Sequence, residues 1–231
     1  MASKENRRRG ARRSAADPAA DLAPGSIPEE FWGEGTSPVA RALLGSAVLC
    51  FARKGFHATT TRDITATVGL SPGALYVHFS SKEAVLFEIV RTGHERALQA
   101  VQSQTDDGDS RRYVWRLVAG LVAWHARYHT VARVCQYELA ALEPAHYAAI
   151  LDLRHRFTAV VRSGVERGVS EGVFDVPDVS HAVRAIMSLG IDLVRWYRLD
   201  GADSPEALGE FYADLALRMI GAAPPSRSHE R

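Results

Sequence analysis

Hydroxyl-bearing and basic side chains stand at the starts of two helices that the sequence predicts. Thr60 and Thr61 open the first of these helices, and Lys82 follows Ser81 at the start of the second. A helix N-terminus presents backbone N–H groups without intrahelical partners, and hydroxyl and ammonium groups beside them suit a phosphate. Arg62 is placed to reach a base or a phosphate, although a pairing with a surface acid is an equal alternative. The chemistry indicated is contact with the backbone of a nucleic acid.

Two short helices joined by a tight turn would position these side chains. A long helix begins at Ser37-Pro38, and Gly69 separates the two short helices that follow it. A capping-box pattern at Thr60 and Asp63 opens the first short helix, and Ser71-Pro72 opens the second. Gly69 suits the left-handed backbone of the turn. This is the spacing of a helix-turn-helix, in which the second short helix enters the major groove of DNA.

Several short motifs lie together in residues 41–90. They are Phe51-Ala52-x-x-Gly55-Phe56, Thr59-Thr60-x-x-Asp63-Ile64, Gly69-Leu70-Ser71, Leu75-Tyr76-x-x-Phe79 and Ser81-Lys82-Glu83. In this combination the stretch resembles the DNA-binding domain of TetR-family transcriptional regulators. Thr65 and Ala74 depart from the residues usual in that family, which leaves the operator sequence open.

The resemblance implies which residues contact DNA. The recognition helix would be lined by Ser71, Pro72, Gly73, Ala74 and Tyr76, with base contacts at its N-terminal end. Phosphates would be held by Tyr76, His78, Thr60, Thr61 and Lys82. For Tyr76 and His78 the alternative is that they cap the small hydrophobic core between the helices. The same resemblance implies a homodimer that reads a palindromic double-stranded operator, acts as a repressor and carries a helical domain for a small-molecule effector.

Positive charge is concentrated at the N-terminal end, although the 231-residue chain has a formal net charge of only +1. Residues 1–13 hold six basic side chains and one acidic one, and residues 38–91 hold six basic and three acidic ones. Such asymmetry favours a nucleic-acid partner. The arginine clusters at 7–9 and 12–13 would contact phosphates or enter a minor groove, or else they belong to a solvated tail without a defined role.

Composition and helix signals together predict an all-α protein. Hydrophobic residues make up 46% of the chain and only two cysteines are present, as in a cytoplasmic globular protein. No apolar run reaches the ~20 residues needed to span a bilayer, so we expect no membrane association. We expect an N-terminal three-helix helix-turn-helix domain in 38–85 and a larger helical ligand-binding and dimerisation domain in 86–221. Residues 1–37 and 222–231 are expected to be disordered tails, although Ile27–Trp32 could dock on the domain.

Aromatic and polar side chains in the larger domain predict a small-molecule cavity, because such cavities are mostly apolar with a few polar anchors. The candidates are Trp124, His125, Tyr128, Tyr137, Glu138, Arg154, Phe157 and Trp196. Core packing is the alternative for each of them taken singly. His125 and His129 have the spacing of metal ligands, but no third ligand is evident, so we predict neither a metal site nor a cofactor.

A second resemblance concerns this larger domain. Residues 129–142 and 190–197, together with Arg154, are similar to a TetR-family subgroup whose known members sense acyl-CoA thioesters. The similarity implies a long amphipathic effector with its acyl part inside and its charged nucleotide part near the helix ends. Arg154 is then the candidate anchor for an anionic group, and the alternative is a salt bridge to Asp152 or Glu166.

The last two predicted helices, at residues 178–199 and 204–220, are apolar on several sides and must be largely buried. By the family architecture they would pair with their copies in a second subunit. Candidate interface residues are Ile186, Gly190, Leu193, Tyr197, Leu208, Phe211, Tyr212 and Leu215. The alternative is that these residues are buried within one subunit.

Two other classes of function compete with a DNA-binding regulator. The sequence has no P-loop, no G-x-G-x-x-G after a strand and no G-x-S-x-G, so we predict that the protein is not an enzyme. The other rival is a helix-turn-helix protein that a protein partner controls and that has no ligand cavity.

Overall fold

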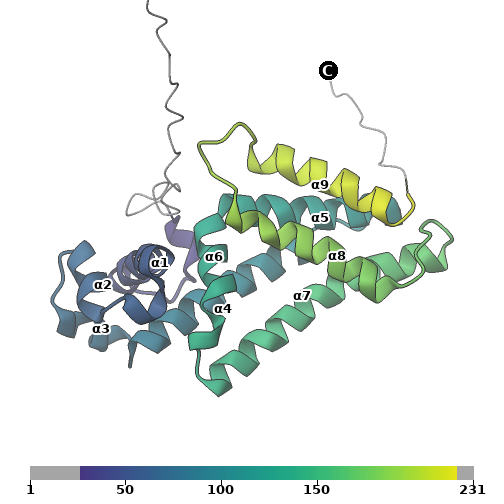
Figure 1. The fold of residues 1–231 in the computed structure, drawn as a ribbon. Coiled ribbons are helices and arrows are strands. Elements are labelled where there is room, and N and C mark those ends of the chain that lie inside the picture. The colour runs from purple at the N-terminus through teal and green to yellow at the C-terminus, as the bar shows by residue number, and fades with distance from the viewer. Residues whose placement is uncertain (1–26, 223–231) are drawn as a thin grey trace, which may run out of the picture.

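The computed structural model describes residues 27–222 as an arrangement of helices (Figure 1). Predictions about residues 1–26 and 223–231, including the arginine clusters, concern positions outside this range. The α-helices are α1 (Pro38–Ala58), α2 (Thr61–Thr67), α3 (Pro72–His78), α4 (Lys82–Gln102), α5 (Ser110–Arg127), α6 (His129–Tyr137), α7 (Pro144–Ser170), α8 (Val179–Asp192) and α9 (Pro205–Met219). The 3-10 helices are η1 (Glu29–Phe31), η2 (Leu139–Ala141) and η3 (Leu193–Arg195). Residues 27–222 contain no strand, which confirms the all-α fold class for this part of the chain.

Side-chain caps start the helices where the sequence predicts them. The Ser37 hydroxyl accepts a hydrogen bond from the Ala40 N–H at 3.3 Å at the start of α1. Thr60 and Asp63 make both hydrogen bonds of a capping box at the start of α2. Ser81 caps α4 in the same way as Ser37 caps α1. These boundaries depend on residues three apart in sequence, so they need no tertiary information.

Helix α8 is shorter than the helix predicted for residues 178–199. It ends at Asp192, and the chain tightens into η3. Leu193, Val194 and Tyr197 are all buried beyond this point. The requirement to place these three side chains in the core redirects the chain, and the helical period of the sequence does not reveal it.

Helices α1, α2 and α3 form one end of the molecule, α5 to α9 form the larger body, and α4 joins the two (Figure 1). In the body α5 lies along α9, and α7 packs against α4 and α5. One continuous hydrophobic core extends through both parts, from Leu75 on α3 and Val48 on α1 to Leu121 on α5. Both ends therefore belong to one packed structure, and α4 packs against α1 as well as against the helices of the body.

The segment before α1 docks on this core, as predicted from the aromatic residues within Ile27–Trp32. Phe31 and Trp32 are buried, and the Phe31 ring lies 5.0 Å from the ring of Tyr128. The guanidinium of Arg96 on α4 donates hydrogen bonds to the carbonyls of Phe31 and Glu30, at 3.0 and 2.8 Å. The folded structure consequently includes η1, which lies before the predicted start of the DNA-binding domain.

The close approach of α9 to α5 depends on Gly209. A Cβ atom at this position would lie 2.6 Å from the carbonyl oxygen of Ala119, which is backbone and therefore unable to move aside. We expect Gly209→Ala to destabilise the protein by roughly 1–3 kcal/mol, a typical overpacking cost. Urea unfolding followed by circular dichroism at one fixed protein concentration measures this change.

The matched control is Gly45→Ala in α1, where a Cβ atom would meet nothing within 4 Å. Alanine favours a helix interior over glycine by about 0.5–1 kcal/mol, so this variant is expected to unfold at higher urea concentration than the parent. Equal midpoints for the two variants would contradict the assigned role of Gly209.

Candidate nucleic-acid interface and ligand cavity

The turn between α2 and α3 has the geometry that the helix-turn-helix pattern requires. Gly69 has a φ of 70°, in the left-handed region that favours glycine. The Leu70 N–H then donates to the Thr65 carbonyl at 2.9 Å. Ile64 on α2 and Leu75 on α3 are completely buried, and their packing sets how α3 lies on α2. The turn and these two side chains fix the orientation of α3.

Helix α3 presents nearly all of its surface to solvent. The exposed residues at its start and along its length are Ser71, Pro72, Gly73, Tyr76, Val77 and His78. Tyr76 is 57% exposed and Val77 is 79% exposed, whereas Ala74 is half-buried. Because Tyr76 and His78 face solvent, neither caps the small core, and the predicted recognition surface is accessible.

At the start of α2, the hydroxyl of Thr60 is used in an internal hydrogen bond, whereas the side chain of Arg62 is exposed. Thr60 is part of the capping box, and its N–H and hydroxyl donate to the carboxylate of Asp63. Those bonds, with a further one from Lys54, lower the pKa of Asp63 to about 2. Arg62 is exposed and makes no ion pair with any residue between 27 and 222, so the pairing considered for it does not occur there. Thr61 is half-buried beside it.

Lys82 and Glu138 hold the backbone of Phe56 from two sides. The ammonium of Lys82 donates to the carbonyls of Phe56 and Thr59 at 2.8 and 2.7 Å and lies 4.2 Å from the centre of the Phe56 ring. The carboxylate of Glu138 accepts a hydrogen bond from the Phe56 N–H at 3.0 Å. This contact is possible because Gly55, with a φ of 75°, breaks the helical backbone just before Phe56. Two residues predicted to meet external ligands thus join α4 and α6 to the end of α1.

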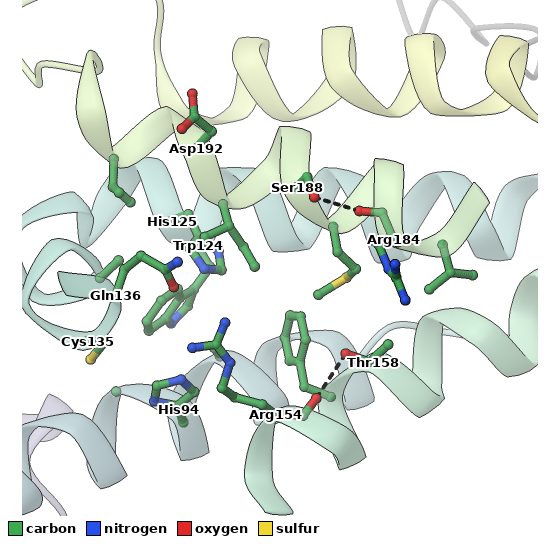
Figure 2. A pocket seen from close by; sticks show the side chains of 18 of the residues that line it. His94, Trp124, His125, Cys135, Gln136, Arg154, Thr158, Arg184, Ser188 and Asp192 are labelled. Carbon is green, nitrogen blue, oxygen red and sulfur yellow. Dashed lines mark hydrogen bonds between the residues drawn. The ribbon is translucent and has the colours of Figure 1, made fainter. Parts of the chain in front are cut away.

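A cavity of about 520 Å³ lies between α4, α5, α6, α7 and α8 (Figure 2). Five of the predicted ligand-binding residues line it: Trp124, His125, Tyr137, Arg154 and Phe157. Its size falls within the range of about 300–1,000 Å³ that is usual for small-molecule sites. The predicted cluster therefore corresponds to a real space in the larger part of the molecule.

Three predicted ligand-binding residues lie outside this cavity. Tyr128 packs against Phe31 and Trp124 in the aromatic contact of the N-terminal segment. Glu138 is held at Phe56, as described above. Trp196 follows η3 and is 50% exposed. These three were predicted as cavity residues because they are aromatic or acidic. The chain changes direction after α5, α6 and α8, and this places them outside the cavity.

Arg154 is a cation on the cavity wall without an acidic partner among the described residues. Neither of the acids considered for it pairs with it, and Glu166 instead lies 3.8 Å from Arg162. His94 and His125 lie near Arg154 and are neutral, because burial lowers the pKa of each to about 4. An anionic group that enters the cavity therefore finds a guanidinium whose charge no carboxylate offsets.

Residues 43–89 match the family described as "Bacterial regulatory proteins, tetR family", and residues 108–220 match "Tetracyclin repressor-like, C-terminal domain". The HTH-type transcriptional repressor KstR2 of Rhodococcus jostii is 30% identical over 187 residues, which cover 79% of this chain and 90% of the relative. The chain belongs to the TetR family of bacterial regulatory proteins.

Two solved structures of the TetR family have the same fold. A regulatory protein of the tetR family from Rhodococcus RHA1 is 40% identical, with a TM-score of 0.77 and coverage of 81% of this chain and 100% of the other. The ketosteroid transcriptional regulator KstR2 of Mycobacterium tuberculosis is 26% identical, with a TM-score of 0.72 and coverage of 84% and 100%. No helix within residues 27–222 of this TetR-family chain combines the length and the hydropathy that crossing a bilayer requires.

The sequence did not predict several residues that line the cavity of this TetR-family protein, or one exposed residue on α3. The further polar or charged cavity residues include His94, Gln136, Arg162, Arg184 and Asp192. His94 was missed because no cavity residue was predicted on α4, and only the tertiary arrangement turns one face of α4 to the cavity. Val77 was missed on α3, although it is two positions after buried Leu75 and so lies on the opposite side of a 3.6-residue helix.

The predicted dimer residues divide into two groups. Ile186, Gly190, Leu193, Tyr197 and Leu208 are buried within the same chain. For example, a Cβ atom at Gly190 would lie 3.1 Å from Leu121 on α5, so this side of α8 packs inside the subunit. These five are covered by their own chain, which is the alternative considered for them, and the interface stays a prediction. Phe211, Tyr212 and Leu215 on α9 are exposed or half-buried and remain candidates.

Proposed function

We propose that this TetR-family protein is a repressor that binds a palindromic operator as a homodimer and releases it when an amphipathic anionic ligand of the acyl-CoA kind enters the cavity. The observation that carries the proposal is the connection between cavity and recognition helix. Helices α4 and α6 both line the cavity, and both hold the backbone of Phe56 through Lys82 and Glu138. Repression is supported by the name of the KstR2 relative, which is a transcriptional repressor.

The dimer is supported by apolar side chains on the outer surface of α8 and α9. Phe211 is 61% exposed, and Leu189 and Met219 are also exposed. Large exposed apolar side chains on neighbouring helices are typical of a protein–protein interface. A two-fold dimer would place two copies of α3 to read the half-sites of a palindrome.

The ligand class is supported by the chemistry of the cavity wall. Apolar side chains such as Phe157, Val183 and Met187 suit an acyl chain or another hydrocarbon body, and Arg154 suits an anionic group. The solved KstR2 relative is named a ketosteroid regulator, which agrees with a largely hydrocarbon effector. The sequence similarity to the acyl-CoA-responsive subgroup favours an acyl-CoA among such molecules.

Release follows from a change in the geometry at Phe56. A ligand that contacts His94 on α4 and Tyr137 on α6 favours the position of these helices that fits it best. Lys82 and Glu138 transmit that position to the end of α1, and α2 and α3 follow because they share its core. The ligand shifts operator binding only by its difference in affinity between the two geometries.

Glu138→Ala tests this connection. Without the carboxylate, the Phe56 N–H loses its acceptor and α6 loses its hold on α1. We expect decanoyl-CoA to bind with unchanged affinity in calorimetry, because Glu138 lies outside the cavity. Its effect on operator affinity in gel shifts is expected to fall roughly fivefold or more, within the usual range of allosteric coupling. An unchanged effect of decanoyl-CoA would contradict the proposed path.

The experiment that tests the whole proposal is selection of DNA sequences bound by the purified full-length protein. We expect an enriched motif with two-fold symmetry and a steep loss of affinity with added salt, because phosphate contacts release counterions. Decanoyl-CoA is then expected to release the selected DNA. Failure to enrich any sequence would overturn the assignment as a DNA-binding repressor, and retention of DNA at saturating decanoyl-CoA would overturn the ligand class.

A further inference from the structure

Two histidines at one end of the cavity are fixed in the same tautomer. The Nδ1 atom of His94 lies 2.8 Å from the carbonyl oxygen of Val90, and the Nδ1 atom of His125 lies 2.8 Å from that of Leu121. A carbonyl oxygen only accepts hydrogen bonds, so in both rings the proton is on Nδ1. The other nitrogen, Nε2, is then an acceptor in each neutral ring.

These Nε2 acceptors have no donor in the described part of the chain. Both histidines line the cavity, and neither ring makes a hydrogen bond there other than the one through Nδ1. Burial holds the pKa of each ring at about 4, so both rings stay neutral near neutral pH. The cavity wall consequently offers two acceptors that a hydrocarbon ligand would cover without replacing their hydrogen bonds to water.

Arg154 provides hydrogen-bond donors at the end of the cavity that holds the two histidines. Figure 2 shows its side chain extending between His94 on one side and the Trp124–His125 pair on the other. Burial is the main cause of the low pKa of His94, and the positive charge of Arg154 lowers it further. A guanidinium only donates hydrogen bonds, whereas the Nε2 atoms of the two neutral imidazoles only accept them. A matching ligand needs an acceptor and a donor group next to each other.

We propose that this end of the cavity selects a ligand that carries a hydroxyl group beside its anionic group, as in a hydroxy acid. The anionic group accepts hydrogen bonds from Arg154, and the hydroxyl donates one to Nε2 of His94 or His125. A site built to pair with a hydroxyl rejects an analogue without it, because the acceptor is then left buried and unpaired. This inference rests on the proposed function in one respect, namely that the cavity is the effector site.

Calorimetry on the purified full-length protein tests the inference with three probes: decanoate, 2-hydroxydecanoate and 3-hydroxydecanoate. We expect at least one hydroxy acid to bind about tenfold more tightly than decanoate, since one recovered hydrogen bond has roughly that effect. In His94→Phe and His125→Phe, separately, we expect the preference to fall in at least one variant, with the affinity for decanoate retained or increased. Circular dichroism checks that each variant is folded, and either variant alone is sufficient for the comparison.

The control is His155→Phe, which replaces an exposed histidine on α7 outside the cavity and should leave the preference unchanged. Equal affinity of the parent for all three probes would overturn the inference, as would a preference that survives in both cavity variants. An operator gel shift separates this failure from failure of the proposed function. If decanoate and the hydroxy acids release DNA equally, the ligand-released repressor stands and the hydroxyl selection is wrong. If none of the three acids binds while decanoyl-CoA still releases DNA, the hydroxyl selection is wrong and the effector site stands.

Discussion

Tyr76→Ala is expected to weaken operator binding at least tenfold at fixed salt, equivalent to about 1.4 kcal/mol or more. Tyr76 is 57% exposed on α3, so its ring and hydroxyl are available for phosphate and sugar contacts. Because the side chain packs little within the protein, the free energy of unfolding should change by less than about 0.5 kcal/mol. Gel shifts with the selected operator measure the first effect, and urea unfolding measures the second.

The control for this variant is Tyr147→Ala. Tyr147 is 40% exposed on α7, in the part of the molecule that carries the cavity. This variant removes the same group at an exposed position outside α3, so operator affinity should not change. A Tyr76→Ala protein that is folded and binds the operator as tightly as the parent would remove α3 from the proposed interface.

Arg154→Met is expected to lower the affinity for decanoyl-CoA by about 10- to 100-fold, because a charge-assisted hydrogen bond contributes roughly 1.5–3 kcal/mol. Methionine keeps the apolar part of the side chain against the cavity wall and removes only the charge. Operator binding without ligand should remain at the parental level. Calorimetry measures the ligand affinity, and gel shifts measure operator binding and its release.

Arg156→Met gives the matched control for the charge. Arg156 lies on the same helix two residues later, is exposed and does not line the cavity. Its replacement should leave the affinity for decanoyl-CoA unchanged. If the two variants lose affinity equally, the effect comes from the general charge of α7, and Arg154 is not the anionic anchor.

Local sequence signals predict the end of the molecule formed by α1, α2 and α3 in detail. The capping box of Thr60 and Asp63, the caps of Ser37 and Ser81 and the turn at Gly69 each act within a few residues, and the structure has them as expected. Ser71 stands at the predicted start of α3, but its side chain makes no capping hydrogen bond. The order of long helix, short helix, turn and short helix follows from these local features. The exposed face of α3 follows in turn, because one buried residue, Leu75, sets the phase of the helix.

Residues whose role depends on distant partners could not be placed in this way. Glu138 was predicted as a ligand contact from its type, but its partner Phe56 is 82 positions away in sequence. Lys82 likewise contacts Phe56 from 26 positions away. A polar residue next to a cavity helix has the same sequence signal whether it faces a ligand or joins two helices, and only the packing of α6 on α1 distinguishes them.

The burial of several candidate dimer residues within one chain has a related physical explanation. Apolar side chains on several sides of a helix show that the helix is buried, but they do not show whether its own chain or a second copy covers it. In α8 the side that carries Ile186 and Gly190 packs within the subunit. For α9, Phe211 is left outside because Gly209 and Leu208 already occupy the side that faces the core.

The way α3 is anchored also bears on how this regulator could diverge or be redesigned. Leu75 is the one completely buried residue of the seven in α3. Substitutions at exposed positions usually change the free energy of unfolding by less than about 0.5 kcal/mol. Most of α3 can therefore mutate with little loss of stability, so that after a gene duplication the exposed face of α3 can change in one copy while the rest of the fold is kept.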